Sequence, residues 1–116
     1  MKEFFNEHFL EAMPLEVSEV IHILKTRWGV TYELKIVQKG QRLYLQMMWG
    51  YLEQQSFIQS ENIFQENLAH VLEIINRLGL SSYVRDWLRT CVLKPKLGRA
   101  VSLPLKVHMS ANEFVL

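Results

Sequence analysis

The chain has 116 residues, of which 49% are hydrophobic and 22% are charged, and its formal net charge is +1. This composition excludes a disordered or fibrous chain and fits a single globular domain over residues 1–116. The lone cysteine, Cys91, excludes an internal disulfide and favours a reducing compartment. Glutamates interrupt the N-terminal segment where a signal peptide needs an apolar run, and no run reaches the ~18 residues of a membrane span. We therefore expect a cytoplasmic protein without a membrane span.

Two helices are expected before the first strand. Lys2–Met13 has the apolar spacing of a short amphipathic helix, which Pro14 ends. Glu16–Trp28 has a stronger periodicity, and Gly29 follows it in the position of a helix stop. The apolar face of this second helix contains Val17, Val20, Ile21, Leu24 and Trp28.

A β-hairpin is expected over Thr31–Trp49, because two runs alternate between apolar and polar residues around a glycine. In the expected register, the two-residue turn starts at Lys39 and pairs Leu34 with Leu45. A turn that starts one residue later would set Lys39 opposite Arg42, and two like charges in that position are unfavourable. The inward row of the second strand would contain Leu43, Leu45, Met47 and Trp49.

A long helix follows the hairpin. Gly50 breaks the alternation, and residues 51–59 are expected to form a loop or one short turn before Ser60, which has the chemistry of a helix N-cap. The helix then runs to Leu78, and Gly79 stops it. Its apolar stripe contains Ile63, Phe64, Leu68, Val71, Leu72, Ile75 and Leu78.

A further helix and a last strand complete the pattern. Ser81 or Ser82 is expected to cap the helix. The final strand, Ala100–Val107, contains Pro104, which cannot donate to a ladder, so this strand is expected at a sheet edge or with donors on one side only. The apolar face of the helix contains Val84, Trp87, Leu88, Cys91 and Val92.

Together these elements predict an α+β fold in the order (α)-α-β-β-α-α-β. Helices would pack on one face of a small antiparallel sheet, which is made of the hairpin and the C-terminal edge strand. The core of the domain would span residues 15–107, with an extension at 1–14 and a tail at 108–116. The other edge of the sheet would be available to a strand or to a second copy of the chain, which leaves a homodimer open.

Two runs of sequence resemble a known family. They are YLQ-x-MW-x-YLEQ-x-SF, over Tyr44–Phe57, and P-x-LG-x-AVS-x-P, over Pro95–Pro104. From about Glu16 to Val107, the chain resembles a small family of domains of unknown function from cyanobacteria and plant plastids. The resemblance implies a photosynthetic lineage and a cytosolic or stromal location. It brings no activity, cofactor or catalytic residue.

The sequence argues against several kinds of chemistry. Cys91 lies on an apolar helix face near the helix C-terminus, where the dipole disfavours a thiolate, so we expect a buried packing residue. No carboxylate pair stands out for acid–base work, and the common nucleotide-binding motifs are absent. We therefore expect no catalytic residue and no cofactor, and we favour a non-enzymatic protein. No metal site is expected, because metal-ligand spacing is missing among the histidines His8, His22, His70 and His108.

A basic region lies between Arg85 and Lys106. Arg85 and Arg89 are expected on one exposed helix face, which the basic loop Lys94–Arg99 would continue. Phosphate would suit such a surface, but a net charge of +1 is low for a dedicated nucleic-acid binder. Nucleic acid is therefore an unlikely partner and ranks third.

The leading hypothesis is a protein-interaction or assembly module. Tyr44 points away from the core row of its strand, and the run Tyr51–Phe57 combines aromatic and amide side chains, which interface centres favour. The alternative for this outward face is that a helix covers it, or that Tyr44 packs across the strands over Lys35. The candidate partner-binding residues are Tyr44, Gln46, Tyr51, Glu53, Gln54, Gln55, Lys94, Lys96 and Arg99.

A second hypothesis is a small-molecule-binding or enzymatic pocket. It would lie between the hairpin and the helices, with Tyr51, Glu53, Gln54 and Arg99 at its edge. A concave cavity with Glu53 or Cys91 at its base would favour this second hypothesis.

Overall fold

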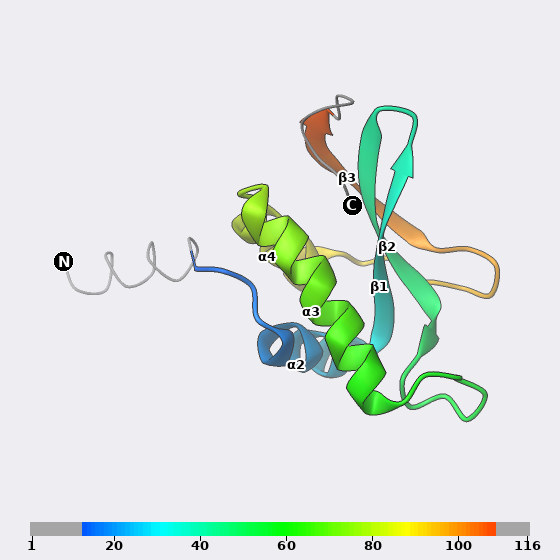
Figure 1. Cartoon of the computed structure of the whole chain (residues 1–116). Coiled ribbons are helices and arrows are strands. Elements are labelled where there is room, and N and C mark those ends of the chain that lie inside the picture. The colour runs from blue at the N-terminus through cyan, green and yellow to red at the C-terminus, as the bar shows by residue number, and fades with distance from the viewer. Residues whose placement is uncertain (1–12, 109–116) are drawn as a thin grey trace.

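Three helices lie on one side of a three-stranded antiparallel sheet in the computed structural model, which describes residues 13–108 (Figure 1). The strand order is β1-β2-β3, so β3 is an edge strand, and the predicted α+β fold is confirmed. The predicted helix Lys2–Met13, Met13 aside, lies outside the described residues. The elements are α2 (Val17–Trp28), β1 (Tyr32–Lys39), β2 (Arg42–Tyr51), α3 (Glu61–Arg77), α4 (Ser81–Thr90) and β3 (Val101–His108).

The core lies between the helices and the inner face of the sheet. The central strand β2 contributes Leu43, Leu45 and Met47, all fully buried. Helices α2 and α4 add the fully buried Leu24 and Leu88. Burial of one side chain of this size stabilises the fold by roughly 1.5–3 kcal/mol. The buried row of β2 therefore determines which face of the sheet packs against the helices.

The hairpin register differs from the expected one. Leu34 pairs with Met47, and Lys39 pairs with Arg42 across a turn whose first residue is Gly40. Gly40 has a φ of 63°, and none of the described residues other than glycines has a positive φ. This φ pattern is that of a type II′ turn, whose twist matches the twist of the flanking strands.

The expectation failed because turn geometry outweighs a repulsion between exposed charges. Two like charges opposite each other cost only roughly 0.2–1 kcal/mol. The Lys39 ammonium also lies 5.7 Å from the centre of the Tyr44 ring, which gives it a favourable neighbour away from Arg42.

Replacing Arg42 with glutamate should therefore stabilise the domain by about 0.5 kcal/mol, because it converts a like-charge pair into an opposite-charge pair. Urea unfolding at low ionic strength measures the change. Lys94→Glu is the control, since it makes the same change in net charge away from the sheet. Equal stabilities for the two variants would contradict the register.

The strand β2 continues past the point where a break was expected. Gly50 and Tyr51 still belong to β2, and the ring of Phe57 folds back over Gly50, within 3.4 Å of where a Cβ would lie. The pairing with β1 is also irregular. Tyr32 pairs with Tyr51 and Leu34 pairs with Met47, so an advance of two residues along β1 corresponds to four residues along β2. This irregularity takes Trp49 out of the fully buried row, so Trp49 is half-buried rather than a core residue as expected.

The helix boundaries agree with the sequence in part. The Ser60 hydroxyl accepts a hydrogen bond from the Ile63 amide at 3.3 Å, which confirms the N-cap of α3. Ile63 was expected on the apolar stripe but is 49% exposed, because in the first turn of α3 it faces away from the core. Neither serine caps α4: Ser81 is its first residue, and Val92 lies beyond its end and is 88% exposed.

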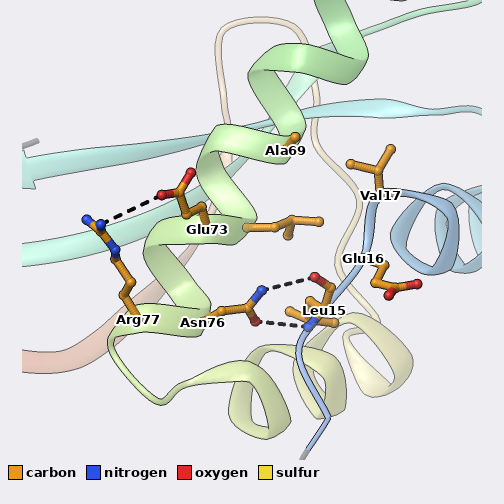
Figure 2. A pocket seen from close by; sticks show the side chains of 8 residues that line it. Leu15, Glu16, Val17, Ala69, Glu73, Asn76 and Arg77 are labelled. Carbon is orange, nitrogen blue, oxygen red and sulfur yellow. Dashed lines mark hydrogen bonds and ion pairs between the residues drawn. The ribbon is translucent and has the colours of Figure 1, made fainter.

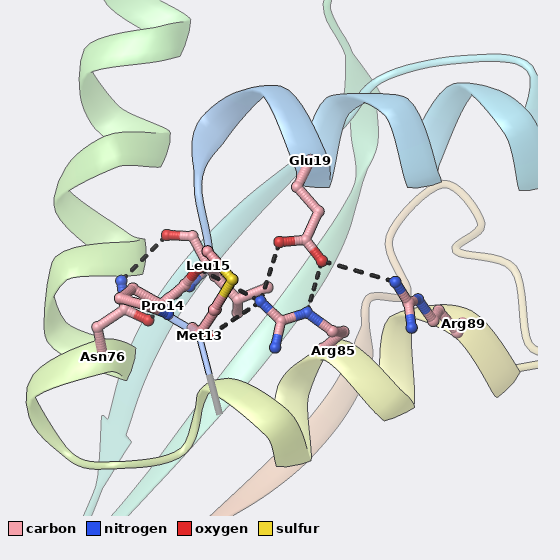
Figure 3. Close-up of polar contacts among 7 residues, drawn as sticks. All are labelled: Met13, Pro14, Leu15, Glu19, Asn76, Arg85 and Arg89. Carbon is pink, nitrogen blue, oxygen red and sulfur yellow. Dashed lines mark hydrogen bonds and ion pairs between the residues drawn. The ribbon is translucent and has the colours of Figure 1, made fainter. Parts of the chain in front are cut away.

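Arg85 ties α4 to α2 and to the segment before α2 (Figure 3). Its Nε and Nη2 donate to the two oxygens of Glu19 at 2.5 and 3.0 Å, and Nη2 also donates to the carbonyls of Met13 and Pro14. The hydrogen bonds with Glu19 raise the pKa of Arg85. Arg85 is only 5% exposed, so its expected place on an exposed basic face was wrong.

Candidate partner-binding site

A cleft of about 410 Å³ lies where the C-terminal end of α2, the end of β2 and the loop after α4 meet. Its walls are mostly aromatic and apolar, and one ammonium group, that of Lys94, belongs to them. We call it the aromatic cleft. Its lining residues are Trp28, Val30, Tyr32, Trp49, Tyr51, Gln54, Lys94, Pro95 and Leu97.

The aromatic rings of the cleft are held by local contacts. The ring of Tyr32 meets the rings of Trp28 and Tyr51 edge-on, with centroids 6.3 and 5.9 Å apart. The guanidinium of Arg27 lies 4.6 Å from the centre of the Trp28 ring, and its Nη1 donates to the carbonyl of Leu88 at 2.8 Å. Such edge-on and cation–π contacts fix ring orientation, so the cleft is pre-organised.

The loop 92–99 carries the largest concentration of exposed apolar side chains in the described part of the chain. Val92 and Leu97 are each 88% exposed, and Leu93 is 62% exposed. Lys96 and Arg99 pair as an isolated β-bridge around Gly98, whose φ is 76°. The turn therefore presents Leu97 at its tip between cations, beside the aromatic cleft.

The structure brings together three of the nine candidate residues at the cleft wall. Tyr51, Gln54 and Lys94 line it, although Lys94 is far from the other two in sequence. Lys96 and Arg99 belong to the adjoining turn. Gln55 is exposed in the loop after β2.

Two candidates lie elsewhere, on the face of the sheet that the helices leave open. Tyr44 sits in a cross-strand row between Val37 and Pro104. Gln46 Nε2 donates to the Ser102 hydroxyl at 3.2 Å. The described helices do not cover this face (Figure 1), and the lysine over the Tyr44 ring is Lys39 rather than the expected Lys35.

Sequence reasoning missed Trp28, Trp49 and Leu97 as members of the site. The two tryptophans follow the apolar period of their elements, so they were assigned to the core. Each lies near the end of its element, immediately before a glycine, and that position was the available indication that the side chain also faces the cleft. Trp28 still packs against the core, as expected, whereas Trp49 does not belong to it. Leu97 follows two lysines in a Pro- and Gly-containing loop, where an apolar residue has no core to enter.

Glu53 does not line the cleft, and its contacts stabilise the fold. Its Oε1 accepts a hydrogen bond from the Thr31 amide at 2.7 Å, and its Oε2 accepts one from the Thr31 hydroxyl at 2.8 Å. Burial alone would raise the pKa of Glu53, but the hydrogen bonds from Thr31 and the nearby Lys25 outweigh it and lower this pKa. Glu53 therefore fastens the loop after β2 to the start of β1.

The hydrogen bonds between Glu53 and Thr31, which we call the Glu53 clamp, predict that the free energy of unfolding falls in acid. Because the Glu53 pKa is lower in the folded state, its stabilisation is complete above the ordinary value of ~4.3 and is lost as pH falls through the lowered value. The free energy of unfolding of wild type should therefore fall more steeply below about pH 4.5 than that of Glu53→Gln. Urea titrations across this pH range make the comparison, with Glu61→Gln as the exposed control. Parallel pH profiles for Glu53→Gln and wild type would refute the clamp.

Other chemical groups do not converge on the cleft. Cys91 is buried, as expected, and its sulfur lies 3.7 Å from the carbonyl of Leu93. His22 and His70 are exposed helix residues. Within residues 13–108, no three His, Cys, Asp or Glu side chains are placed to hold a metal ion. The same range contains no helix that is long and apolar enough to cross a membrane.

A separate groove of about 540 Å³ runs between α3 and the segment before α2 (Figure 2). The Asn76 amide group grips the backbone of Leu15: the Leu15 amide donates to Oδ1 at 2.9 Å, and Nδ2 donates to the Leu15 carbonyl at 3.0 Å. Arg77 pairs with Glu73 at 3.9 Å on the rim. These contacts anchor the N-terminal segment to α3, so we assign the groove a structural role.

The architecture defines a small α+β domain with helices on one face of an antiparallel sheet and an aromatic cleft at one end. The chain belongs to the DUF3067 family, a domain of unknown function, whose match spans residues 18–115. It is similar in structure to the Alr2454 protein from Nostoc sp. strain PCC 7120, solved by solution NMR. The two are 34% identical, the match covers 78% of this chain and 88% of that one, and the TM-score is 0.74. No curated protein matches the chain significantly.

Proposed function

We propose that this chain is a non-enzymatic protein-interaction module whose contact surface is the aromatic cleft together with the loop 92–99. The observation that carries the proposal is the convergence of Trp28, Trp49 and Tyr51 beside the exposed Leu97. Tryptophan and tyrosine are the residues that dominate binding energy in protein interfaces. Exposed apolar side chains gathered in one loop are typical of an interaction site.

The electrostatics of this surface favour a partner with negative charge. Lys94 and Leu97 line the cleft, and Lys96 and Arg99 flank Leu97 on the same exposed turn. Arg27 lies against Trp28 on the other wall. An acidic segment with an apolar or aromatic anchor would fill the cleft and meet these cations at its rim.

The lining of the cleft supports binding more than catalysis. Its side-chain polar groups are an ammonium, an amide, two phenols and two indole N–H groups, and no carboxylate, thiol or imidazole belongs to it. Glu53 and Cys91, the two residues named for the base of an enzymatic pocket, do not line the cleft, and Glu53 instead accepts hydrogen bonds from Thr31. The cyanobacterial relative supports a photosynthetic source for the partner, and as part of the same proposal we place the protein in the cytoplasm of such a cell.

Quantitative affinity capture from a cyanobacterial extract tests the proposal. The retained protein is identified and purified, and its Kd is measured for wild type, Leu97→Asp and Tyr44→Ser. Leu97→Asp should weaken binding about tenfold or more, because it places an anion in an apolar anchor site facing an acidic partner. The 88% exposure of Leu97 protects the fold of this variant.

Tyr44→Ser is the matched control on the open face of the sheet and should leave the Kd unchanged. Equal affinities of wild type and Leu97→Asp for the partner would show that the aromatic cleft and its loop are not the contact surface. A loss confined to Tyr44→Ser would move the site to the open face.

A further inference from the structure

The outer edge of β1 differs from the outer edge of β3. In β3, Pro104 removes a backbone donor, which protects that edge against strand pairing. The strand β1 contains no proline and has no neighbour on its outer side among the described strands. The two edges are therefore not equivalent, and β1 is the edge open to a further strand.

The register shows which backbone groups of β1 face outward. Lys39 and Arg42 close a two-residue turn, and pairs in an antiparallel ladder alternate between exchanging hydrogen bonds and not exchanging them. Counting back from this turn, the amide and carbonyl groups of Leu34 and Ile36 point away from β2. These groups are the ones that an added strand would pair with.

A groove of about 430 Å³ follows this edge beneath α3. Ile36 of β1 and Val71 and Ile74 of α3 give it apolar walls, and Gln59 closes one end. The Oε1 atom of Gln59 is buried and has no hydrogen-bond partner among the described residues.

We propose that the β1 edge binds an extended segment of a partner protein as a fourth, antiparallel strand. The charges of β1 specify its pattern, because Glu33 and Lys35 lie at the groove on either side of Leu34. Glu33 pairs with Lys35 at 4.0 Å and accepts a hydrogen bond from Gln59 at 3.3 Å, so an added strand would exchange these contacts for cross-strand pairs. Read from its N-terminus, the segment would be apolar, acidic, apolar, basic, apolar, with its acidic residue opposite Lys35 and its basic residue opposite Glu33. Its apolar side chains would lie in the groove.

A lone strand fits this site better than a second copy of the chain. The β1 strand has the same alternating pattern, from Tyr32 to Ile36, so a second β1 would be complementary in charge. However, α3 forms one wall of the groove, and a two-fold axis at the edge would bring a second α3 against the first. A partner segment without a helix over it avoids this collision.

Synthetic peptides test the proposal without a known partner. The probe is a capped peptide with the sequence Thr-Tyr-Glu-Leu-Lys-Ile-Val, and its matched control, Thr-Tyr-Lys-Leu-Glu-Ile-Val, exchanges the two charges. NMR titration of the full chain should shift the amide signals of Leu34 and Ile36. The control peptide should bind about tenfold more weakly, because both cross-strand charge pairs become repulsive.

The double variant Glu33→Lys/Lys35→Glu should reverse the preference between the two peptides. Equal binding of the two peptides to wild type would overturn the proposal, as would shifts that leave β1 unaffected. Self-association of the chain through β1 in the absence of peptide would overturn it in favour of a second copy. Tyr32 is the cleft residue that belongs to β1, but the groove and the aromatic cleft share no lining residue, so either result leaves the proposed function standing.

Discussion

Replacing Arg85 with alanine is expected to destabilise the domain by about 3–5 kcal/mol, the usual cost of removing one partner of a buried ion pair. The Glu19 carboxylate would lose two hydrogen bonds, and the carbonyls of Met13 and Pro14 would lose a donor. Chemical unfolding monitored by tryptophan fluorescence and circular dichroism measures the loss.

Arg89→Ala is the matched control for this substitution. Arg89 also approaches Glu19, at 3.8 Å, but its side chain is 60% exposed, so its removal should cost about 1 kcal/mol or less. The double variant Glu19→Leu/Arg85→Leu should be more stable than Arg85→Ala, because it leaves no unpaired buried charge. If Arg85→Ala and Arg89→Ala had equal stabilities, Arg85 would not be the link between α4 and α2.

Leu45→Ala is expected to destabilise the domain by about 2–5 kcal/mol, because it opens a cavity beneath the helices. Leu45 is fully buried at the middle of the central strand, paired with Ile36 on one side and Leu103 on the other. Neighbours on both sides limit the collapse that could refill the cavity. Thermal and urea unfolding measure the effect.

Gln46→Ala, one residue further along β2, is the control for the sheet. Gln46 faces the open side, and its hydrogen bond with Ser102 is exposed, so its loss should cost only about 0.5 kcal/mol. A Gln46→Ala cost as large as that of Leu45→Ala would mean that the open face of the sheet is covered by something that stabilises it.

The order of the elements and most of the core could be predicted from the sequence. The alternation of Leu43, Leu45 and Met47 and the helical spacing around Leu68 and Leu72 depend on local chain geometry, which sequence expresses directly. The hairpin register could not be settled in this way. Both candidate registers keep the same faces. A turn that starts at Lys39 would need a positive φ at Lys39, whereas the observed turn needs it only at Gly40.

The candidate site was predictable only in part, because it is assembled from three distant segments. Amphipathic composition marked Tyr51 and Gln54, and charge marked Lys94. Periodicity assigned Trp28 and Trp49 to the core. Trp28 does pack against the core, but a period does not show that a ring near the end of an element also lines a cleft. Arg85 was misplaced for the opposite reason: a cation in a basic run suggests solvent, and its partner Glu19 lies 66 residues away.

The tryptophan indole signals give the most direct test of the proposed contact surface. The chain has three tryptophans, of which Trp28 and Trp49 line the aromatic cleft and Trp87 packs against the core on α4. Addition of the captured and purified partner to ¹⁵N-labelled protein should shift the Trp28 and Trp49 indole signals and leave that of Trp87 in place. Saturable binding with the Trp28 and Trp49 signals unmoved would contradict the account.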